Sequence, residues 1–418
     1  MLQGHGDDIY QYPDIRMNFS SNIFAHADMS ELKAHLCRNI HLIDNYPEPS
    51  PRSLERLIAN KAGVSPDSVL VTNGATEAIY LIAQTLASAQ SGQASVRSSQ
   101  ASVHSGQASV RSSQASAQSG QASVRSSQVE GALHIAPCTH FCSGPQPTFS
   151  EYTDASLLHG LKEEKWSPAT SPIEPIMPIE PIMPIEPMMP IEPMMPIEPI
   201  EPITPNNPIT LLWLCNPNNP TGSIYTPSEI SSFARRFAYV VVDQSYEDLT
   251  LAPMMTANEA ACSQNIIQVH SLTKTYAIPG LRIGYVVASP MVIGMLRRFV
   301  RPWSVNALAI EAGQWLLNHE LKAVPDLPAY LEETQRLRHQ LNLIPGIEAA
   351  PTHTNFILAR VATTTAARLK DILARRHHIL IRDASNFRGL TPHHFRISAQ
   401  TPEENTLLLE ALRAAIAQ

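Results

Sequence analysis

One lysine, Lys274, lies in a segment whose side chains could hold an aldehyde and a phosphate. The segment Ser271-Leu-Thr-Lys-Thr-Tyr-Ala-Ile-Pro-Gly-Leu-Arg282 places hydroxyl groups around the lysine and an arginine after it. A lysine amine condenses with a carbonyl group, and the aldehyde of pyridoxal phosphate is the usual partner. The hydroxyls of Ser271 and Thr273 and the guanidinium of Arg282 suit the phosphate of that cofactor. We therefore expect a pyridoxal phosphate site here rather than a surface lysine in a Pro-Gly loop.

Polar residues follow two apolar runs that have the composition of buried strands. Leu211-Leu-Trp-Leu-Cys215 leads into Asn216-Pro-Asn-Asn-Pro-Thr-Gly222, and Tyr239-Val-Val-Val-Asp243 ends in a carboxylate with Tyr246 three residues later. Ligands in open α/β sheets bind at the carboxyl ends of the strands. This placement predicts that Asn219, Asp243 and Tyr246 lie near one ligand. The alternative is a strand that ends in a solvated aspartate.

A third strand and turn could bind the phosphate. Val69-Leu-Val-Thr-Asn-Gly-Ala-Thr-Glu77 leads into the apolar helix expected over 78–86. The first amides of a helix have no partner inside the helix, so they form an anion site. Gly74, Ala75 and Thr76 are therefore candidates for a phosphate cradle.

Together these segments resemble the class I/II aminotransferases, the fold type I pyridoxal phosphate enzymes. The resemblance implies that Lys274 carries pyridoxal 5'-phosphate and that Asp243 pairs with its pyridine nitrogen. It implies that Asn219 and Tyr246 bind the phenolic oxygen and that Phe149, in Pro147-Thr-Phe-Ser-Glu-Tyr152, stacks on the ring. A core phenylalanine is the alternative for Phe149.

The resemblance also implies a partner subunit. Tyr46, in Tyr46-Pro47, matches the family tyrosine that reaches the phosphate of the neighbouring subunit's cofactor. We therefore expect a homodimer with shared active sites.

Two arginines bear on the substrate. Arg382 ends the strand expected over 379–382, and Arg396 lies within the strand expected over 394–398. Arg396 resembles the family arginine that binds the substrate carboxylate. Arg382 resembles a second anion ligand of the branch that acts on phosphorylated substrates. That branch includes histidinol-phosphate aminotransferase and threonine-phosphate decarboxylase, so a small phosphorylated amino acid or amine is the expected substrate.

Three further segments favour the decarboxylase. They are the opening with His5, the run Asn18-Phe-Ser-Ser-Asn22 and the run Trp303-Ser-Val-Asn306. The resemblance makes His5 and Asn22 substrate-binding candidates. It implies an L-threonine-O-3-phosphate decarboxylase that gives (R)-1-aminopropan-2-yl phosphate for cobalamin biosynthesis. The alternatives are a histidinol-phosphate aminotransferase or related aminotransferase, and a non-catalytic cofactor-binding scaffold whose repeats bind partners.

The order of strands and helices predicts an α/β protein. The resemblance implies a large, mostly parallel sheet flanked by helices over 47–288, and a smaller α+β domain from 1–46 and 289–418. Two low-complexity insertions, 91–128 and 172–205, interrupt the large domain. The first is rich in Ser and Gln, and the second has proline at every third residue, so neither can build a core. In the smaller domain we expect helices over 327–343, 366–375 and 401–416, and strands over 355–360, 379–382 and 394–398.

Composition excludes some classes of function. The chain has 418 residues and a net charge of −7, which does not suit nucleic acid binding. No apolar run approaches the ~20 residues of a membrane span, and the start does not resemble a secretory signal, so a cytoplasmic protein is expected. The cysteines are odd in number and dispersed, as expected for reduced thiols. His134, Cys138, His140 and Cys142 lie close together, but no second ligand pair accompanies them, so no metal site is expected.

Overall fold

A computed structural model describes residues 8–88, 138–165, 210–319, 321, 323–324 and 326–417. Both low-complexity insertions, together with His5 and His134, lie outside the described residues. No helix in these ranges is long and apolar enough to cross a membrane.

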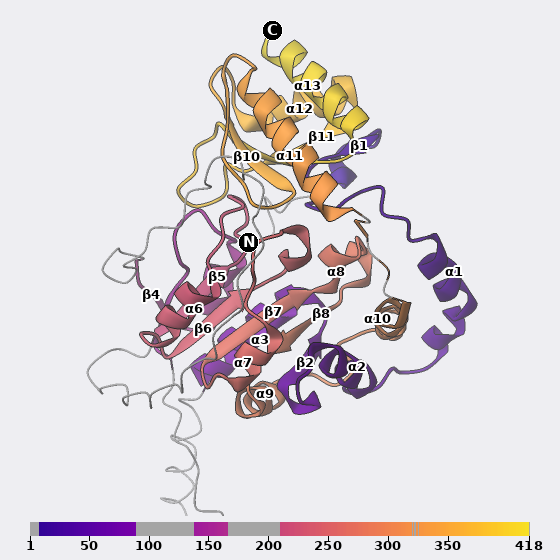
Figure 1. Ribbon diagram of the computed structural model, residues 1–418, viewed down its shortest axis with the longest axis vertical. Helices are drawn as coiled ribbons and strands as arrows, with labels where there is room; N and C mark the ends of the chain where they lie inside the picture. The colour runs from indigo at the N-terminus through magenta and orange to yellow at the C-terminus, as the bar shows by residue number, and fades with distance from the viewer. Residues whose placement is uncertain are drawn as a thin grey trace, which may run out of the picture.

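A seven-stranded sheet forms the centre of the lower part of the molecule in Figure 1, and its order is β2-β8-β7-β6-β5-β3-β4. Strand β8 runs antiparallel to both of its neighbours, and the other pairs are parallel. The sheet therefore confirms the α/β prediction. Its strands are β2 (Val69–Thr72), β3 (His140–Cys142), β4 (Lys162–Glu163), β5 (Thr210–Cys215), β6 (Tyr239–Asp243), β7 (Ile266–Ser271) and β8 (Gly284–Val287).

Helices cover both faces of this sheet because its central strands are apolar on both sides. Every residue of β5, β6 and β7 is buried. Alternate side chains point to opposite faces, so Trp213 packs in one core and Leu212 in the other. The first core holds α3 (Gly74–Ser88), α5 (Glu151–Leu158) and α9 (Pro290–Arg297). The second holds α1 (Ser30–Arg38), α2 (Arg52–Ala62), α6 (Pro227–Ala234), α7 (Ala257–Cys262) and α10 (Ala307–His319).

A smaller α+β unit lies above the large sheet in Figure 1. It contains an antiparallel sheet of order β12-β13-β10-β9 and a parallel pair of β1 with β11. Its own apolar core joins these strands to three helices. The elements are β1 (Met17–Asn18), α11 (Leu327–Asn342), β9 (Ile347–Ala349), β10 (Phe356–Val361), α12 (Ala366–His377), β11 (Ile379–Leu380), β12 (Arg382–Asp383), β13 (His394–Ser398) and α13 (Pro402–Ile416).

One expected strand of the smaller unit is wrong. Residues 379–382 do not form a single strand, because the chain changes partner at the buried residue Ile381. Before it, Leu380 pairs with Asn18 of β1, and after it, Arg382 pairs with Arg396 of β13. A distant N-terminal segment thus pairs with the first half of the run, which local sequence does not reveal.

The chain crosses between the two units more than once. Phe19 and Tyr330 pack in the core of the smaller unit, whereas Leu32 of α1 and Leu316 of α10 pack under the large sheet. The predicted division into 47–288 and 1–46 with 289–418 stays a prediction. The remaining short elements are η1 (Ile9–Gln11), η2 (Ile40–Asp44), η3 (Pro66–Ser68), η4 (Glu247–Leu249), α8 (Leu272–Thr275) and η5 (Pro279–Leu281).

Candidate active site

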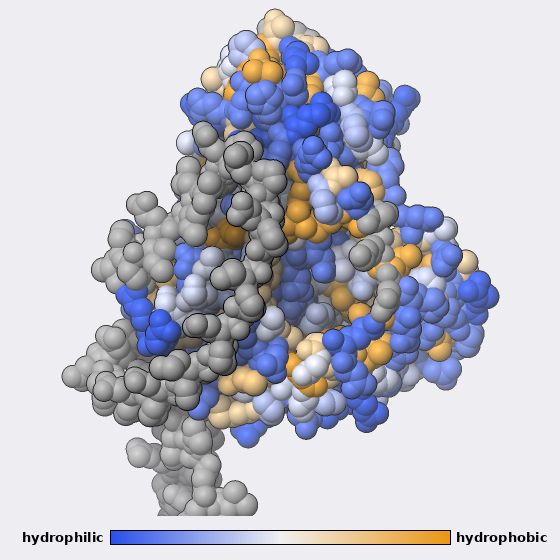
Figure 2. Space-filling model, viewed as in Figure 1, coloured by the Kyte–Doolittle hydropathy of each residue, from blue (hydrophilic) through white to orange (hydrophobic). Residues whose placement is uncertain are grey.

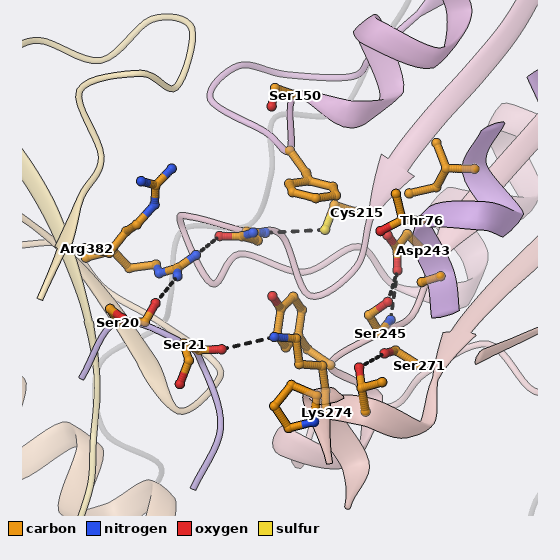
Figure 3. Close-up of a pocket in the computed structure, with 18 of the residues that line it drawn as sticks. Ser20, Ser21, Thr76, Ser150, Cys215, Asp243, Ser245, Ser271, Lys274 and Arg382 are labelled. Carbon is orange, nitrogen blue, oxygen red and sulfur yellow. Dashed lines mark hydrogen bonds between the residues drawn. The ribbon is translucent and has the colours of Figure 1, made fainter. Parts of the chain in front are cut away.

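A pocket of about 280 Å³ lies between the carboxyl edge of the large sheet and the smaller unit. Figure 2 shows the surface hollowed between these two parts, and Figure 3 shows the polar side chains that converge there. The described lining residues include most of the predicted site: Ala75, Thr76, Phe149, Asn219, Asp243, Tyr246, Ser271, Thr273, Lys274, Arg282, Arg382 and Arg396. Residues far apart in the sequence therefore meet in one cavity.

Lys274 enters the pocket from the short helix α8, which follows directly after β7. Its Nζ donates a hydrogen bond of 3.0 Å to the backbone carbonyl of Ser21, as Figure 3 shows. The same nitrogen lies 6.0 Å from the centre of the Tyr246 ring. The amine is thus held between the two structural units, at the position that the sequence predicts for a cofactor lysine.

Asp243 ends β6 and is buried at the base of the pocket. One carboxylate oxygen accepts hydrogen bonds from the backbone amide of Ser245, at 3.0 Å, and from its hydroxyl, at 2.5 Å. The other oxygen accepts a hydrogen bond of 2.8 Å from the Tyr152 hydroxyl. Burial raises the pKa of Asp243, and the hydrogen bonds from Ser245 and Tyr152 oppose that rise because they favour the charged form.

The first turn of α3 faces Arg282 at one end of the pocket. Gly74 has a φ of +78°, and a Cβ built there would lie 2.6 Å from Nη2 of Arg282. The guanidinium therefore packs directly against this glycine, whose positive φ is a conformation that other residues rarely adopt. A Cβ on Gly284 would lie 2.8 Å from the backbone nitrogen of Ala75, so β8 also approaches this turn closely. Helix amides, an arginine and the linked hydroxyls of Ser271 and Thr273, 2.6 Å apart, supply the donors of an anion site.

Arg396 is buried on the opposite side of the pocket. Its guanidinium donates to the side-chain oxygen of Asn219 and, at 2.7 Å, to the backbone carbonyl of Ser20. Its Nε has no hydrogen-bond partner among the described residues. Burial, opposed by Tyr246 and aided by the charge of Arg382, lowers the pKa of Arg396 to about 10. The described contacts of this cation are therefore neutral groups.

Arg382 lies directly across from Arg396 in the antiparallel pair β12 and β13. Its Nη2 donates a hydrogen bond of 2.8 Å to the side chain of Asn386, and its guanidinium lies 5.6 Å from the centre of the Phe387 ring. Burial lowers the pKa of Arg382. Like charges across a strand pair repel, so this arrangement suits an anion placed between the two side chains.

Asn22 and Tyr246 form a link between the smaller unit and the pocket. Nδ2 of Asn22 donates to the Tyr246 hydroxyl at 3.3 Å. Asn22 has a φ of 56°, and its buried Oδ1 has no hydrogen-bond partner among the described residues. Burial raises the pKa of Tyr246 to about 12, so its hydroxyl stays a neutral donor near pH 7. Asn22 does not itself line the cavity, although the neighbouring Ser20 and Ser21 do.

Besides Asn22, three predicted site residues are not among the lining residues of this pocket: Gly74, which precedes the lining residue Ala75, Tyr46 and His5. Tyr46 is 85% exposed, and its ring lies 5.4 Å from that of Trp303 with 43° between the planes, so its proposed role in a neighbouring subunit stays a prediction. His5 lies outside the described residues. Among the described residues, no three His, Cys, Asp or Glu side chains are placed to hold a metal ion.

Sequence reasoning missed several residues that shape the site: Ser20, Ser21, Tyr152, Cys215, Ser245 and Asn386. Two of them had a detectable signal. Ser245 stands two residues after Asp243, the spacing at which a carboxylate accepts from the local backbone. Tyr152 follows Phe149 by three residues, at the start of α5, and the two rings are in contact edge to face. The contacts of Ser20 and Ser21 depend on backbone carbonyls, which no residue type reveals.

Residues 197–412 match the family of aminotransferases of class I and II. The chain belongs to this family. Threonine-phosphate decarboxylase of Salmonella typhimurium is 34% identical over 209 residues, which are 48% of this chain and 56% of that protein. Histidinol-phosphate aminotransferase of Symbiobacterium thermophilum is 33% identical over 211 residues, 50% of this chain and 57% of that protein. The chain thus spans little more than half the length of the curated relatives it matches.

The fold extends the similarity over nearly the whole chain. The crystal structure of L-threonine-O-3-phosphate decarboxylase from Porphyromonas gingivalis has a TM-score of 0.73 and 28% sequence identity, and the match covers 96% of this chain and 100% of that one. The predicted family and the predicted fold type are therefore confirmed. Members of this family are pyridoxal-phosphate-dependent enzymes, which also confirms the predicted cofactor.

The pocket fits pyridoxal phosphate on its own chemistry. The donors at the start of α3 and on Arg282 gather around Gly74, whose φ of +78° other residues rarely adopt. A lysine amine and a buried carboxylate line the same cavity as these donors. Lys274 would hold the aldehyde carbon and Asp243 the ring nitrogen, and the first turn of α3 with Arg282 would hold the phosphate.

Proposed function

We propose that this protein decarboxylates L-threonine O-3-phosphate to an aminopropan-2-yl phosphate. The observation that carries the proposal is that Arg382 and Arg396, both buried, stand opposite each other on paired strands and line the pocket that Lys274 also lines. Two such cations bind a doubly charged phosphate more strongly than they bind a singly charged carboxylate. A substrate with both a phosphate and an amine would be held by the arginines at one end and meet Lys274 at the other.

Each residue of the pocket has a task in this reaction. Pyridoxal phosphate, when bound, supplies an aldehyde for the substrate amine and a ring that accepts electrons. Asp243, while ionised, keeps a proton on the ring nitrogen. Tyr246 donates a hydrogen bond from its neutral hydroxyl. Lys274 moves a proton at the α-carbon of the substrate after the carboxylate has left as carbon dioxide.

The competing reaction is transamination of a phosphorylated amine. With the cofactor bound, the bond that would break is the one whose electrons could overlap with the ring system. A transaminase presents the C–H bond in the position for that overlap, whereas a decarboxylase presents the bond to the carboxylate. Holding the phosphate with Arg382 and Arg396 leaves the carboxylate of threonine phosphate free to take that position. Similarity to both a threonine-phosphate decarboxylase and a histidinol-phosphate aminotransferase supports the same substrate class.

We also propose that the working unit is a homodimer. Apolar and aromatic side chains are exposed around η2, where Ile40 is 52%, Ile43 is 63% and Trp303 is 50% exposed, next to Tyr46. Exposed apolar side chains that gather on one surface are typical of a protein interface. A second subunit on this surface would bring Tyr46 to the phosphate end of its neighbour's pocket.

Two assays decide between the candidate reactions. The purified protein with pyridoxal phosphate is given L-threonine O-3-phosphate, and carbon dioxide and the phosphorylated amine are measured. In parallel it is given histidinol phosphate and 2-oxoglutarate, and glutamate is measured. We expect carbon dioxide release in the first assay and little or no glutamate in the second. If histidinol phosphate is the better substrate and no carbon dioxide appears, the transaminase replaces the decarboxylase.

A further inference from the structure

The two oxygens of Asp243 are held in different ways, and one of them is held by a tyrosine outside the pocket lining. We propose that Tyr152 is a positioning residue. Its hydrogen bond keeps Asp243 ionised and orients the Asp243 carboxylate so that its open acceptor position faces the ring nitrogen of the cofactor. The inference rests on the proposed function in one respect, namely that Asp243 faces that nitrogen. The hydrogen bond itself is a feature of the protein alone.

Counting lone pairs shows which direction remains open. A carboxylate has about four acceptor positions, two on each oxygen. Ser245 occupies both positions on Oδ1 with its amide and its hydroxyl. Tyr152 occupies one position on Oδ2, at 2.8 Å. Since Asp243 lines the pocket, the remaining position on Oδ2 is available to a donor inside the cavity.

Packing leaves Tyr152 little freedom to turn away. The side chain is fully buried on α5, and its ring stacks on Trp213 of β5 with 5.3 Å between centres and 10° between planes. Trp213 is itself fixed, because its indole nitrogen donates to Ser156 at 3.0 Å. Phe149 meets the Tyr152 ring edge to face at 5.7 Å. The packing of the core therefore fixes the direction of the Tyr152 hydroxyl, and the hydrogen bond from that hydroxyl fixes the orientation of the Asp243 carboxylate.

The charge of Asp243 depends on this hydrogen bond because the surroundings disfavour it. Burial raises the pKa of the carboxyl, while Tyr152 and Ser245 lower it. The other titratable groups near it are Cys215 on β5, whose pKa burial raises to about 12, Tyr246 after β6, and His270 on β7, whose charge favours ionised Asp243. Burial raises the pKa of Tyr152 well above its usual value, so it remains a donor at every pH at which the protein works.

The variant Tyr152→Phe removes the hydroxyl and keeps the ring that packs on Trp213. A matched control is Tyr80→Phe, because the Tyr80 hydroxyl donates to the Glu151 carboxylate at 2.9 Å, beside the site but outside the pocket. A second variant, Ser245→Ala, removes one donor from the other oxygen of Asp243 and leaves α5 untouched. For each protein, pyridoxal phosphate binding is measured from its visible absorbance across about pH 6 to 9.

We expect cofactor binding about tenfold weaker or worse in Tyr152→Phe, in line with a hydrogen bond to a charged group. The difference in cofactor affinity between Tyr152→Phe and the wild type should grow as pH falls, because Asp243 in the variant takes up its proton at a higher pH than in the wild type. Ser245→Ala should shift binding in the same direction, and Tyr80→Phe should match the wild type. Equal affinity and equal pH dependence in Tyr152→Phe and wild type would overturn the proposal.

A measurement without cofactor separates this inference from the proposed function. In the cofactor-free protein, the hydrogen bond stabilises the ionised carboxylate more than the neutral acid. The loss of thermal stability in Tyr152→Phe should therefore be largest above the pKa of Asp243 and should shrink as pH falls through it. If the wild type fails to turn over threonine phosphate but this pH dependence is present, the proposed function is wrong and the role of Tyr152 stands. A loss of stability that does not change with pH overturns the role of Tyr152 itself.

Discussion

Arg382 on β12 and Arg396 on β13 face each other across one antiparallel register position, and both are buried at the wall of the same pocket. Like charges at directly opposite strand positions destabilise the empty protein and favour an anion that binds both. The described partners of Arg396 are an amide oxygen and a backbone carbonyl. The charge of this arginine is thus available to a ligand.

Replacing either arginine by alanine should weaken use of the phosphorylated substrate. Hydrogen bonds to charged groups contribute about 1.5–3 kcal/mol each, so kcat/KM should fall roughly ten- to hundredfold in Arg382→Ala and in Arg396→Ala. Steady-state kinetics with L-threonine O-3-phosphate measure this. The control is Arg360→Ala, because Arg360 lies on the same small sheet but pairs with Glu348 at the surface. A control as impaired as the pocket variants would mean that loss of sheet stability explains the effect.

Substitution of Lys274 should abolish turnover while the fold persists. Lys274→Ala removes the amine that condenses with the cofactor, and Lys274→Arg keeps the positive charge but not that chemistry. Both variants should lose the visible absorbance of the lysine-bound cofactor and all measurable carbon dioxide release. Circular dichroism should match the wild type. Wild-type turnover in Lys274→Arg would show that charge, and not condensation, is what this position supplies.

Gly74→Ala tests the phosphate end of the pocket. The backbone there has a φ of +78°, and the added Cβ would meet Arg282 Nη2 at 2.6 Å, so either the turn or the arginine must move. We expect about 1–3 kcal/mol less stability and about tenfold weaker cofactor binding. Gly294→Ala is the matched control, since no heavy atom lies within 4 Å of a Cβ built at that position in α9. It should leave binding unchanged and raise stability by up to about 1 kcal/mol.

The pH dependence of kcat/KM should show two limbs with different origins. As pH falls, Asp243 takes up a proton at a pKa that burial has raised, so activity falls on the acid side. As pH rises through about 10, Arg396 loses its proton and the free enzyme loses half of its anion site. Tyr246, with a pKa of about 12, should not contribute below that pH. A bound anion favours the charged guanidinium, so kcat should not show the alkaline limb. An alkaline limb of equal size in kcat would assign it to another group.

The sequence by itself indicated most of the residues that line this pocket and the type of most elements near it. The β6 strand and its terminal carboxylate were predicted at their observed bounds, because three consecutive valines before the aspartate favour a buried strand. The family resemblance rested on motifs around Lys274, Asn219 and Arg282 that are local in sequence. Each can be recognised without knowing what packs against it.

Tertiary structure alone decided how these groups are held. The split of 379–382 into two strands follows from β1, a segment more than three hundred residues earlier, pairing with β11. Tyr152 reaches Asp243 because α5 packs over β5 and β6, and Ser21 meets Lys274 because the two structural units meet at the pocket. Such contacts join residues whose types are unremarkable, and their energy comes from packing that no local pattern encodes. Residue type therefore determines which interactions a side chain can form, and the fold determines which partner it contacts.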